Sequence, residues 1–183
     1  MKRSLHRLPL ALIASLITTP VCAESWTLMP EASTLSFTGT QTGTSFEGAF
    51  NQFEADITFD ANTLSESNIQ ITIHTGSVET GSADRDTTLP GADWFDTTNH
   101  PTATFASTDV VATDAGYQAN GTLTIKGTTK EVALPFTVTI EGNIAHATGG
   151  LTINRNDFGV GTGSLSAMAG NDVTIYLDIK ASH

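Results

Sequence analysis

Residues 117–140 read YQANGTLTIKGTTKEVALPFTVTI, two alternating stretches joined by a short turn. The odd positions from Tyr117 to Ile125 and the even positions from Val132 to Ile140 are apolar or small, while the positions between them are mostly polar. An apolar residue at every second position is typical of a half-buried β-strand, and the glycine between the stretches is typical of a tight turn. The segment therefore predicts an antiparallel hairpin with one buried face.

The same period of two extends through most of the chain. Further alternating runs are Leu35–Phe37, Ile69–Ile73, Ala145–Ile153 and Val173–Ile179. Phe46 and Phe50 occupy even positions, whereas the phenylalanines from residue 53 to residue 59 occupy odd ones. This change of parity at Asn51–Gln52 predicts a β-bulge where a long strand bends. Pro135 has no backbone N–H, so it predicts an edge, a bulge or a locally unpaired stretch within its strand.

Residues 81–101 form the one region without this alternation. Ser82 is placed to cap a short helix, and Trp94-Phe95 follow in a second helical turn. No linker, low-complexity tract or repeat divides the rest of the chain. Eight or so half-buried strands must close on themselves or pack as a sandwich to protect their edges. We expect an all-β fold, one domain of roughly eight antiparallel strands with a short helical insertion, closed as a barrel or packed as a sandwich.

The first residues have the composition of a secretory signal peptide. Three basic residues among the first seven precede an apolar run from Leu8 to Ile17, and Val21-Cys22-Ala23 supplies small residues for cleavage. We expect residues 1–23 to be removed and residues 24–183 to form the mature domain.

The composition of that domain excludes several classes of function. It carries five basic and nineteen acidic residues, a net charge of −14, which repels phosphate backbones and argues against nucleic acid as a partner. Cys22 is the only cysteine, so no thiolate remains to bind a metal or act as a nucleophile. The histidines lack the spacing of a metal site, and there is no Gly-x-Ser-x-Gly motif. We expect no catalytic residue, no metal and no resident cofactor.

The inward positions of the expected strands suggest where a ligand would bind. Small residues such as Ala119, Gly121 and Ala145 share the inward parity with phenylalanines. They indicate either an apolar tunnel or a close approach of neighbouring strands, and the sequence does not decide between the two. The candidate ligand-binding residues are Phe37, Phe46, Phe50, Phe53, Ile125 and Phe136 in the wall of the tunnel, with Trp94 and Phe95 in the insertion above it.

Other interpretations remain open at this stage. One is an enzyme that acts on a lipophilic substrate with Asp93 or His100 as acid or base, and another is a structural protein whose barrel is filled by its own side chains. Stable insertion into a membrane is not expected, because the chain has few aromatic residues to form interfacial girdles. Arg85 and Arg155 are expected to pair with acidic neighbours and tie the helix and a strand end to the barrel.

Five segments, in this order and spacing, resemble the YceI-like family. They are residues 47–60, 77–96, 101–107, 121–130 and 154–159, the last reading NRNDFG. The resemblance implies a single antiparallel eight-stranded, lipocalin-like barrel in the periplasm, with the short helical insertion near one mouth. It also implies an apolar cavity that holds a polyisoprenoid, an isoprenoid quinone or a similar lipid, and a membrane b-type cytochrome as a partner.

A homodimer is a further expectation. Many members carry a histidine where this chain has Gln41 or Thr42, so the resemblance does not carry a head-group contact over to that position. The function we expect is that of a periplasmic lipid carrier.

Overall fold

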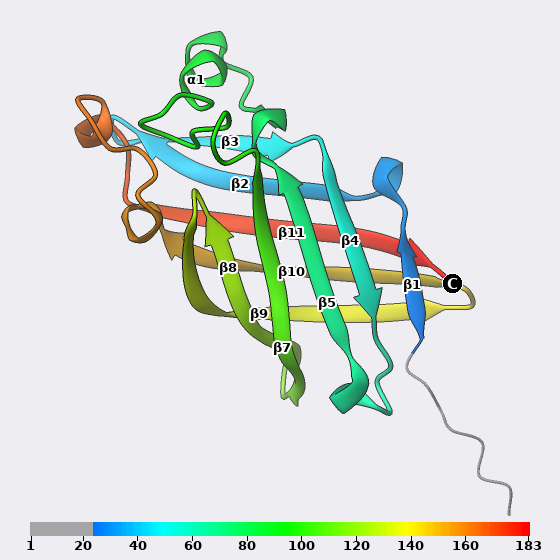
Figure 1. Cartoon of the computed structure of the whole chain (residues 1–183). Helices are drawn as coiled ribbons and strands as arrows, with labels where there is room; N and C mark the ends of the chain where they lie inside the picture. Colours follow the sequence, from blue (N-terminus) through cyan, green and yellow to red (C-terminus); the bar gives the residue numbers. More distant parts are fainter. Residues whose placement is uncertain (1–23) are drawn as a thin grey trace, which may run out of the picture.

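A computed structural model describes residues 24–183 as a β-barrel with one short α-helix (Figure 1). The signal peptide expected over residues 1–23 lies outside the described residues. The strands are β1 (Ser25–Leu28), β2 (Thr34–Gln41), β3 (Thr44–Phe50), β4 (Phe53–Thr58), β5 (Asn68–His74), β6 (Val78–Glu79), β7 (Thr102–Thr113), β8 (Gly116–Ile125), β9 (Thr128–Glu141), β10 (Ile144–Asn154) and β11 (Asp172–Ser182). The α-helix is α1 (Ala83–Thr88), and the 3₁₀ helices are η1 (Pro30–Ala32), η2 (Leu64–Glu66), η3 (Thr75–Ser77), η4 (Arg155–Phe158) and η5 (Ser166–Met168).

The eleven strand segments make up eight barrel strands, because three of the barrel strands are each interrupted and so consist of two segments. β1 and β2 both pair with β11, on either side of η1, so together they make one barrel strand. β3 pairs with β2 on one side and with β6 on the other. β4 pairs with β1 and β5 in the same way, so β3–β4 and β5–β6 are two further barrel strands, each with a bend. Every pairing is antiparallel, and the β1–β11 pairing closes the sheet. The expected eight-stranded antiparallel barrel is confirmed.

The chain bends at Asn51–Gln52, as the parity of the phenylalanines predicted, but not through a bulge. β3 ends at Phe50 and β4 begins at Phe53, and the backbone N–H of Asn51 donates to the carbonyl oxygen of Ser77 across the bend at 3.1 Å. A bulge keeps the ladder continuous, whereas here the ladders to both neighbouring barrel strands are interrupted at residues 51–52. Because of this two-residue break, Phe46 and Phe50 before it and Phe53 and Phe59 after it all face the interior of the barrel.

Pro135 lies where one edge of β9 loses its partner. β9 pairs with β8 along residues 128–136, but its pairing with β10 begins only at Phe136, opposite Gly149. Pro135 thus lies in a stretch of β9 that is unpaired towards β10, which is one of the three alternatives predicted for it. Before that point β9 diverges from β10, and η4 lies against both strands.

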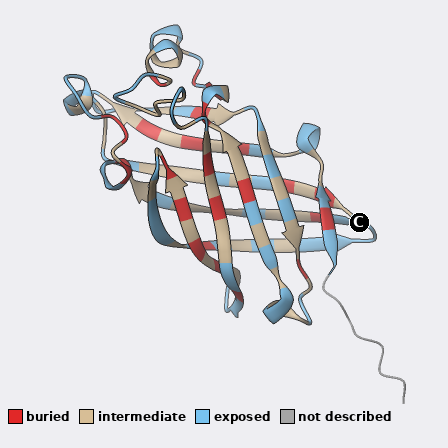
Figure 2. Cartoon of the chain, viewed as in Figure 1, coloured by how far each residue is buried: buried red, intermediate tan, exposed pale blue. Residues whose placement is uncertain are grey.

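Buried and exposed residues alternate along the strands (Figure 2). Figure 1 shows α1 and the loop that contains η5 at one end of the barrel, and the C-terminus at the other. Ser82 occupies the N-cap position of α1, although its side chain makes no capping hydrogen bond. The backbone N–H groups of Gly161 and Thr162 both donate to the carbonyl oxygen of Asp93, at 2.8 and 2.9 Å, so the helical insertion and the η5 loop are tied together over one mouth.

Gly121 marks a close approach of two strands. The register of β7 against β8 shifts between Ser107 and Asp109, and a Cβ atom at Gly121 would overlap the carbonyl oxygen of Ala106. We expect Gly121→Ala to lower the free energy of unfolding by about 1–3 kcal/mol, the usual cost of overpacking, as measured by denaturant unfolding. Gly76→Ala is the control, because a Cβ there has no neighbour within 4 Å. Equal stability of the two variants would show that the approach of β7 to β8 imposes no such restriction.

Candidate ligand cavity

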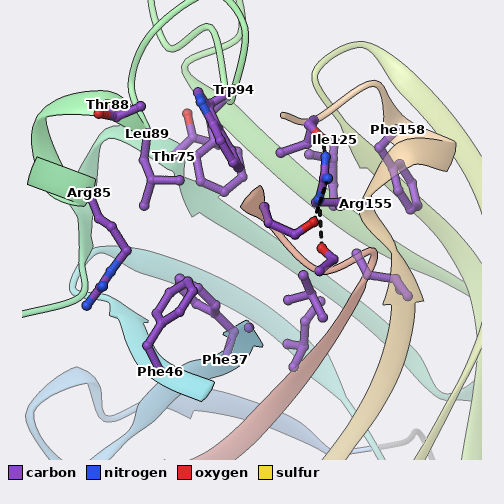
Figure 3. Close-up of a pocket in the computed structure, with 18 of the residues that line it drawn as sticks. Phe37, Phe46, Thr75, Arg85, Thr88, Leu89, Trp94, Ile125, Arg155 and Phe158 are labelled. Carbon is purple, nitrogen blue, oxygen red and sulfur yellow. Dashed lines mark hydrogen bonds between the residues drawn. The ribbon is translucent and has the colours of Figure 1, made fainter. Parts of the chain in front are cut away.

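The barrel encloses an apolar cavity of about 270 Å³ at the end covered by the insertion (Figure 3). Its floor and walls come from β2, β3, β5, β7, β8, β10 and β11, and its cover comes from α1, the turn after α1 and the loop around η5. The apolar side chains that line it include Leu35, Phe37, Phe46, Phe50, Ile73, Leu89, Trp94, Phe95, Leu123, Ile125, Ile153, Val173 and Ile175. The walls are the inward-facing, alternating positions of these strands.

A series of aromatic contacts joins the wall of the cavity to its cover. The Phe37 ring lies 6.3 Å from that of Phe46, nearly perpendicular to it, and 5.5 Å from that of Phe50. Phe50 in turn meets Phe95 of the insertion edge-to-face, with 5.7 Å between ring centroids. Such pairs add stability beyond the area they bury, so the insertion is held against the strands by the same side chains that face the cavity.

Six of the eight candidate binding residues line this cavity, and two do not. Those that line it are Phe37, Phe46, Phe50, Trp94, Phe95 and Ile125. Phe53 and Phe136 instead line a second apolar cavity of about 80 Å³ deeper in the barrel. The break at residues 51–52 explains the difference for Phe53, because β4 continues towards the far end of the barrel while β3 stays beside the insertion.

Some of the small inward residues leave space inside the barrel, whereas others lie where two strands approach each other closely. Ala145 and Ala147 line the second cavity, so their size leaves space inside the barrel. Gly121 lines neither cavity and is explained by the approach of β7. Gly149 satisfies both descriptions, since it lines the second cavity and a Cβ there would crowd Phe136.

Arg155 lies beneath the cover with only 5% of its surface exposed. Its guanidinium donates to the carbonyl oxygens of Gly170 (2.8 Å), Val160 (2.7 Å), Gly161 (2.7 Å), Ser166 (2.9 Å) and Ala169 (3.1 Å). The expected pairing with an acidic neighbour is wrong for this residue, because backbone oxygens take up all of its nitrogens. Burial lowers the pKa of Arg155, yet a guanidinium starts so high that it stays charged at neutral pH. It organises the chain between η4 and β11.

Arg85 of α1 brings a second cation to the cavity, at its mouth. Its guanidinium donates to the side chain of Gln41 at 3.1 Å and to Thr80 at two atoms, and lies 4.3 Å from the centre of the Phe46 ring. The Asp86 carboxylate accepts hydrogen bonds from the backbone N–H and hydroxyl of Thr80 rather than pairing with Arg85. Arg85 therefore ties the helix to β2 and β3 as expected, but without an acidic partner, and two of its five N–H donors have no partner among these contacts.

The η5 loop contributes residues that the sequence analysis did not identify. Leu165 and Met168 line the cavity although 45% and 41% of their surfaces are exposed. Residues 159–163, just before them, are rich in glycine, but nothing in their composition indicates that this loop folds over the mouth. Lys126, which directly follows β8, connects the insertion to the chain before η5. Its ammonium group donates hydrogen bonds to the carbonyl oxygens of Ala92 (2.7 Å) and Gly159 (3.0 Å).

The two groups considered for acid–base chemistry do not line the cavity. Asp93 and His100 line neither cavity, and Asp84 is the one acidic residue within residues 24–183 that lines the larger cavity. Over the same residues, no three His, Cys, Asp or Glu side chains gather in a group able to hold a metal ion. No helix in this part of the chain is long and apolar enough to cross a membrane.

Relatives in sequence are bacterial proteins of the UPF0312 group. One from Pseudomonas paraeruginosa is 36% identical over 119 residues, an alignment that covers 62% of this chain and 62% of that protein. Another from Pectobacterium carotovorum is 42% identical over 87 residues, covering 48% of this chain and 45% of the other. The alignments thus span less than two thirds of these relatives.

Solved structures extend the likeness over the barrel. BcnA of Burkholderia cenocepacia is 33% identical with a TM-score of 0.80, over 85% of this chain and 99% of BcnA. A polyisoprenoid binding domain from Saccharophagus degradans, implicated in plant cell wall breakdown, matches with a TM-score of 0.65 at 17% identity, over 86% of this chain and 97% of that domain, which shows a shared fold alone. The model of the YceI-like domain matches residues 26–181. Because that match spans nearly every described residue, the chain belongs to the YceI-like family.

Proposed function

We propose that this protein binds one lipid with a single apolar chain, of the polyisoprenoid type, inside the barrel and carries it without transforming it. The observation that carries the proposal is the apolar cavity of about 270 Å³, enclosed by strands on its sides and by the insertion and the η5 loop at its mouth. Apolar, concave and preformed sites of this kind are where lipophilic ligands bind. The Saccharophagus protein, a polyisoprenoid binding domain of the same fold, supports the choice of ligand class.

The lining suggests how such a lipid would be oriented. Phe37, Ile125 and Ile175 offer only apolar surface to a chain in the interior, while Gln41 and Arg85 sit together at the mouth. A polar head that accepts hydrogen bonds, such as the carbonyl of a quinone or a hydroxyl, would meet the two unused donors of Arg85.

Burial of the chain supplies enough free energy for useful affinity. Each methylene removed from water contributes about 0.8 kcal/mol, so a dozen contribute roughly 10 kcal/mol before the costs of association and ordering are subtracted. Binding of this kind therefore needs no charged anchor, and a longer buried chain binds more tightly. A periplasmic location, an isoprenoid quinone as the particular lipid and a membrane b-type cytochrome as its source or acceptor are parts of the same proposal.

Extraction of the protein purified from its own host tests this function. We expect native mass spectrometry to show one lipid per chain, and organic extraction followed by mass spectrometry to identify an isoprenoid. The delipidated protein should rebind the extracted lipid in a one-to-one ratio and gain thermal stability as it does so. Protein that carries no lipid from its host, and takes up none of the isoprenoids of that host, would contradict the proposal.

A further inference from the structure

The interior of the barrel contains two cavities placed end to end. The cavity at the mouth and the smaller cavity beyond it share no lining residue, yet they share three strands. On β5 the first is lined by Ile73 and the second by Ile71, and on β11 the change falls between Ile175 and Leu177. A single layer of side chains therefore separates the two spaces at one level of the barrel.

Phe105 is a bulky side chain placed between the two cavities. It is 6% exposed, belongs to the core and lines neither cavity. Its neighbour on β5 is Ile71, which lines the deeper cavity, and its neighbour on β8 is Leu123, which lines the cavity at the mouth. The ring of Phe105 consequently lies at the boundary between the two.

Leu151 holds the corresponding position on β10. It packs against the same core and lines neither cavity, while Ile153 on one side of it lines the first cavity and Gly149 on the other side lines the second. Phe105 and Leu151 are both apolar, so an apolar chain that displaced them would leave no polar group without a partner. Their removal would join the two cavities.

The volumes of the two cavities indicate how the boundary between them would affect the binding of a ligand. Sites for small molecules usually measure about 300–1,000 Å³, and the cavity at the mouth, about 270 Å³, lies just below that range. The deeper cavity, about 80 Å³, is too small to be a site for such a molecule alone, and apart from Thr148 and Gly149 its lining is apolar throughout. It suits the end of a chain that enters through the mouth.

We propose that Phe105, together with Leu151, sets the length of chain that the barrel accepts by closing off the deeper cavity, and that opening this layer turns the deeper cavity into a second subsite for the end of a longer isoprenoid chain. This inference rests on the proposed function, since it concerns the same ligand. A chain that stops at Phe105 fills only the cavity at the mouth. A carbon added beyond that point increases the affinity only in a variant in which these side chains no longer separate the two cavities.

A series of isoprenoid alcohols of increasing length tests the inference: geraniol, farnesol, geranylgeraniol and solanesol. Affinities are measured for the full delipidated protein by titration calorimetry, with native mass spectrometry to establish stoichiometry. For the wild type we expect affinity to rise along the series and then to level off. For Phe105→Ala we expect the rise to continue by one further alcohol, with a gain of roughly tenfold over the wild type for that alcohol.

Val110→Ala is the matched control, because Val110 is a buried residue of the same strand that lines neither cavity. It should lose stability without changing the preferred length. Leu151→Ala and the milder Phe105→Leu provide the same measurement if Phe105→Ala fails to fold, and each should shift the preference in the same direction. A length profile in these variants identical to that of the wild type would overturn the role of the layer and leave the proposed function intact. A wild type that binds none of the alcohols would instead overturn both.

Discussion

Replacement of Arg155 by methionine is expected to lower the free energy of unfolding by about 3–5 kcal/mol, which for a domain of this size corresponds to a fall of roughly 10 °C in melting temperature. Methionine fills a similar volume but donates no hydrogen bond. The variant therefore leaves the carbonyl oxygens of Gly170, Val160, Gly161, Ser166 and Ala169 without their common donor. Buried acceptors that lose their partner pay the full cost of desolvation.

Two variants separate the hydrogen-bond network from the charge itself. Arg155→Lys keeps the positive charge but offers three donors on one atom in place of five in a planar fork, so it should recover only part of the lost stability. Lys130→Met removes a charge from an exposed position and should change stability by less than about 0.5 kcal/mol. Denaturant unfolding monitored by tryptophan fluorescence measures all three. Full recovery in Arg155→Lys would contradict the account, because it would show that charge rather than geometry holds the loop.

The role of Arg155 also shows what the sequence could and could not predict. Alternation in stretches such as 117–140 was sufficient to predict the strands and their inward faces, since a period of two directly determines which side chains share a face. Closure of the strands into a barrel was implied by the resemblance to the YceI-like family. The partners of Arg155 depend on how the carbonyl groups of the connection between β10 and β11 point, and no periodicity governs that. Composition suggested an acidic partner, whereas the fold supplied backbone oxygens.

The cavity was predictable in its walls and in the part of its cover that Trp94 and Phe95 form, but not in the η5 loop. Phe37, Phe46 and Phe50 could be assigned to the interior because their strands alternate. Because of the break at residues 51–52, Phe53 lines the deeper cavity. A change of parity alone does not say whether a strand contains a bulge or is interrupted. Leu165 and Met168 belong to an irregular loop whose path depends on hydrogen bonds to Asp93 and Arg155.

Replacement of Ile175 by tryptophan is expected to weaken lipid binding by about fiftyfold. Ile175 lies on β11 with its side chain towards the cavity at the mouth. The added indole displaces about three methylenes of the ligand, which at about 0.8 kcal/mol each amounts to roughly 2.4 kcal/mol. In the absence of lipid the indole occupies space that is already present, so the stability of the delipidated protein should change little. The measurement is titration with the lipid extracted from the protein.

Tyr176→Trp is the matched control for this prediction. Tyr176 is the next residue of the same strand, but its side chain points outward with 49% of its surface exposed. Both variants add an indole to β11 and both affect its local strand propensity to a similar degree, so they differ in the face that the indole occupies. If the lipid binds inside the barrel, only the inward variant loses affinity. Equal affinities, with both proteins folded, would mean that the lipid binds elsewhere on the molecule, and the cavity would then have no part in carrying it.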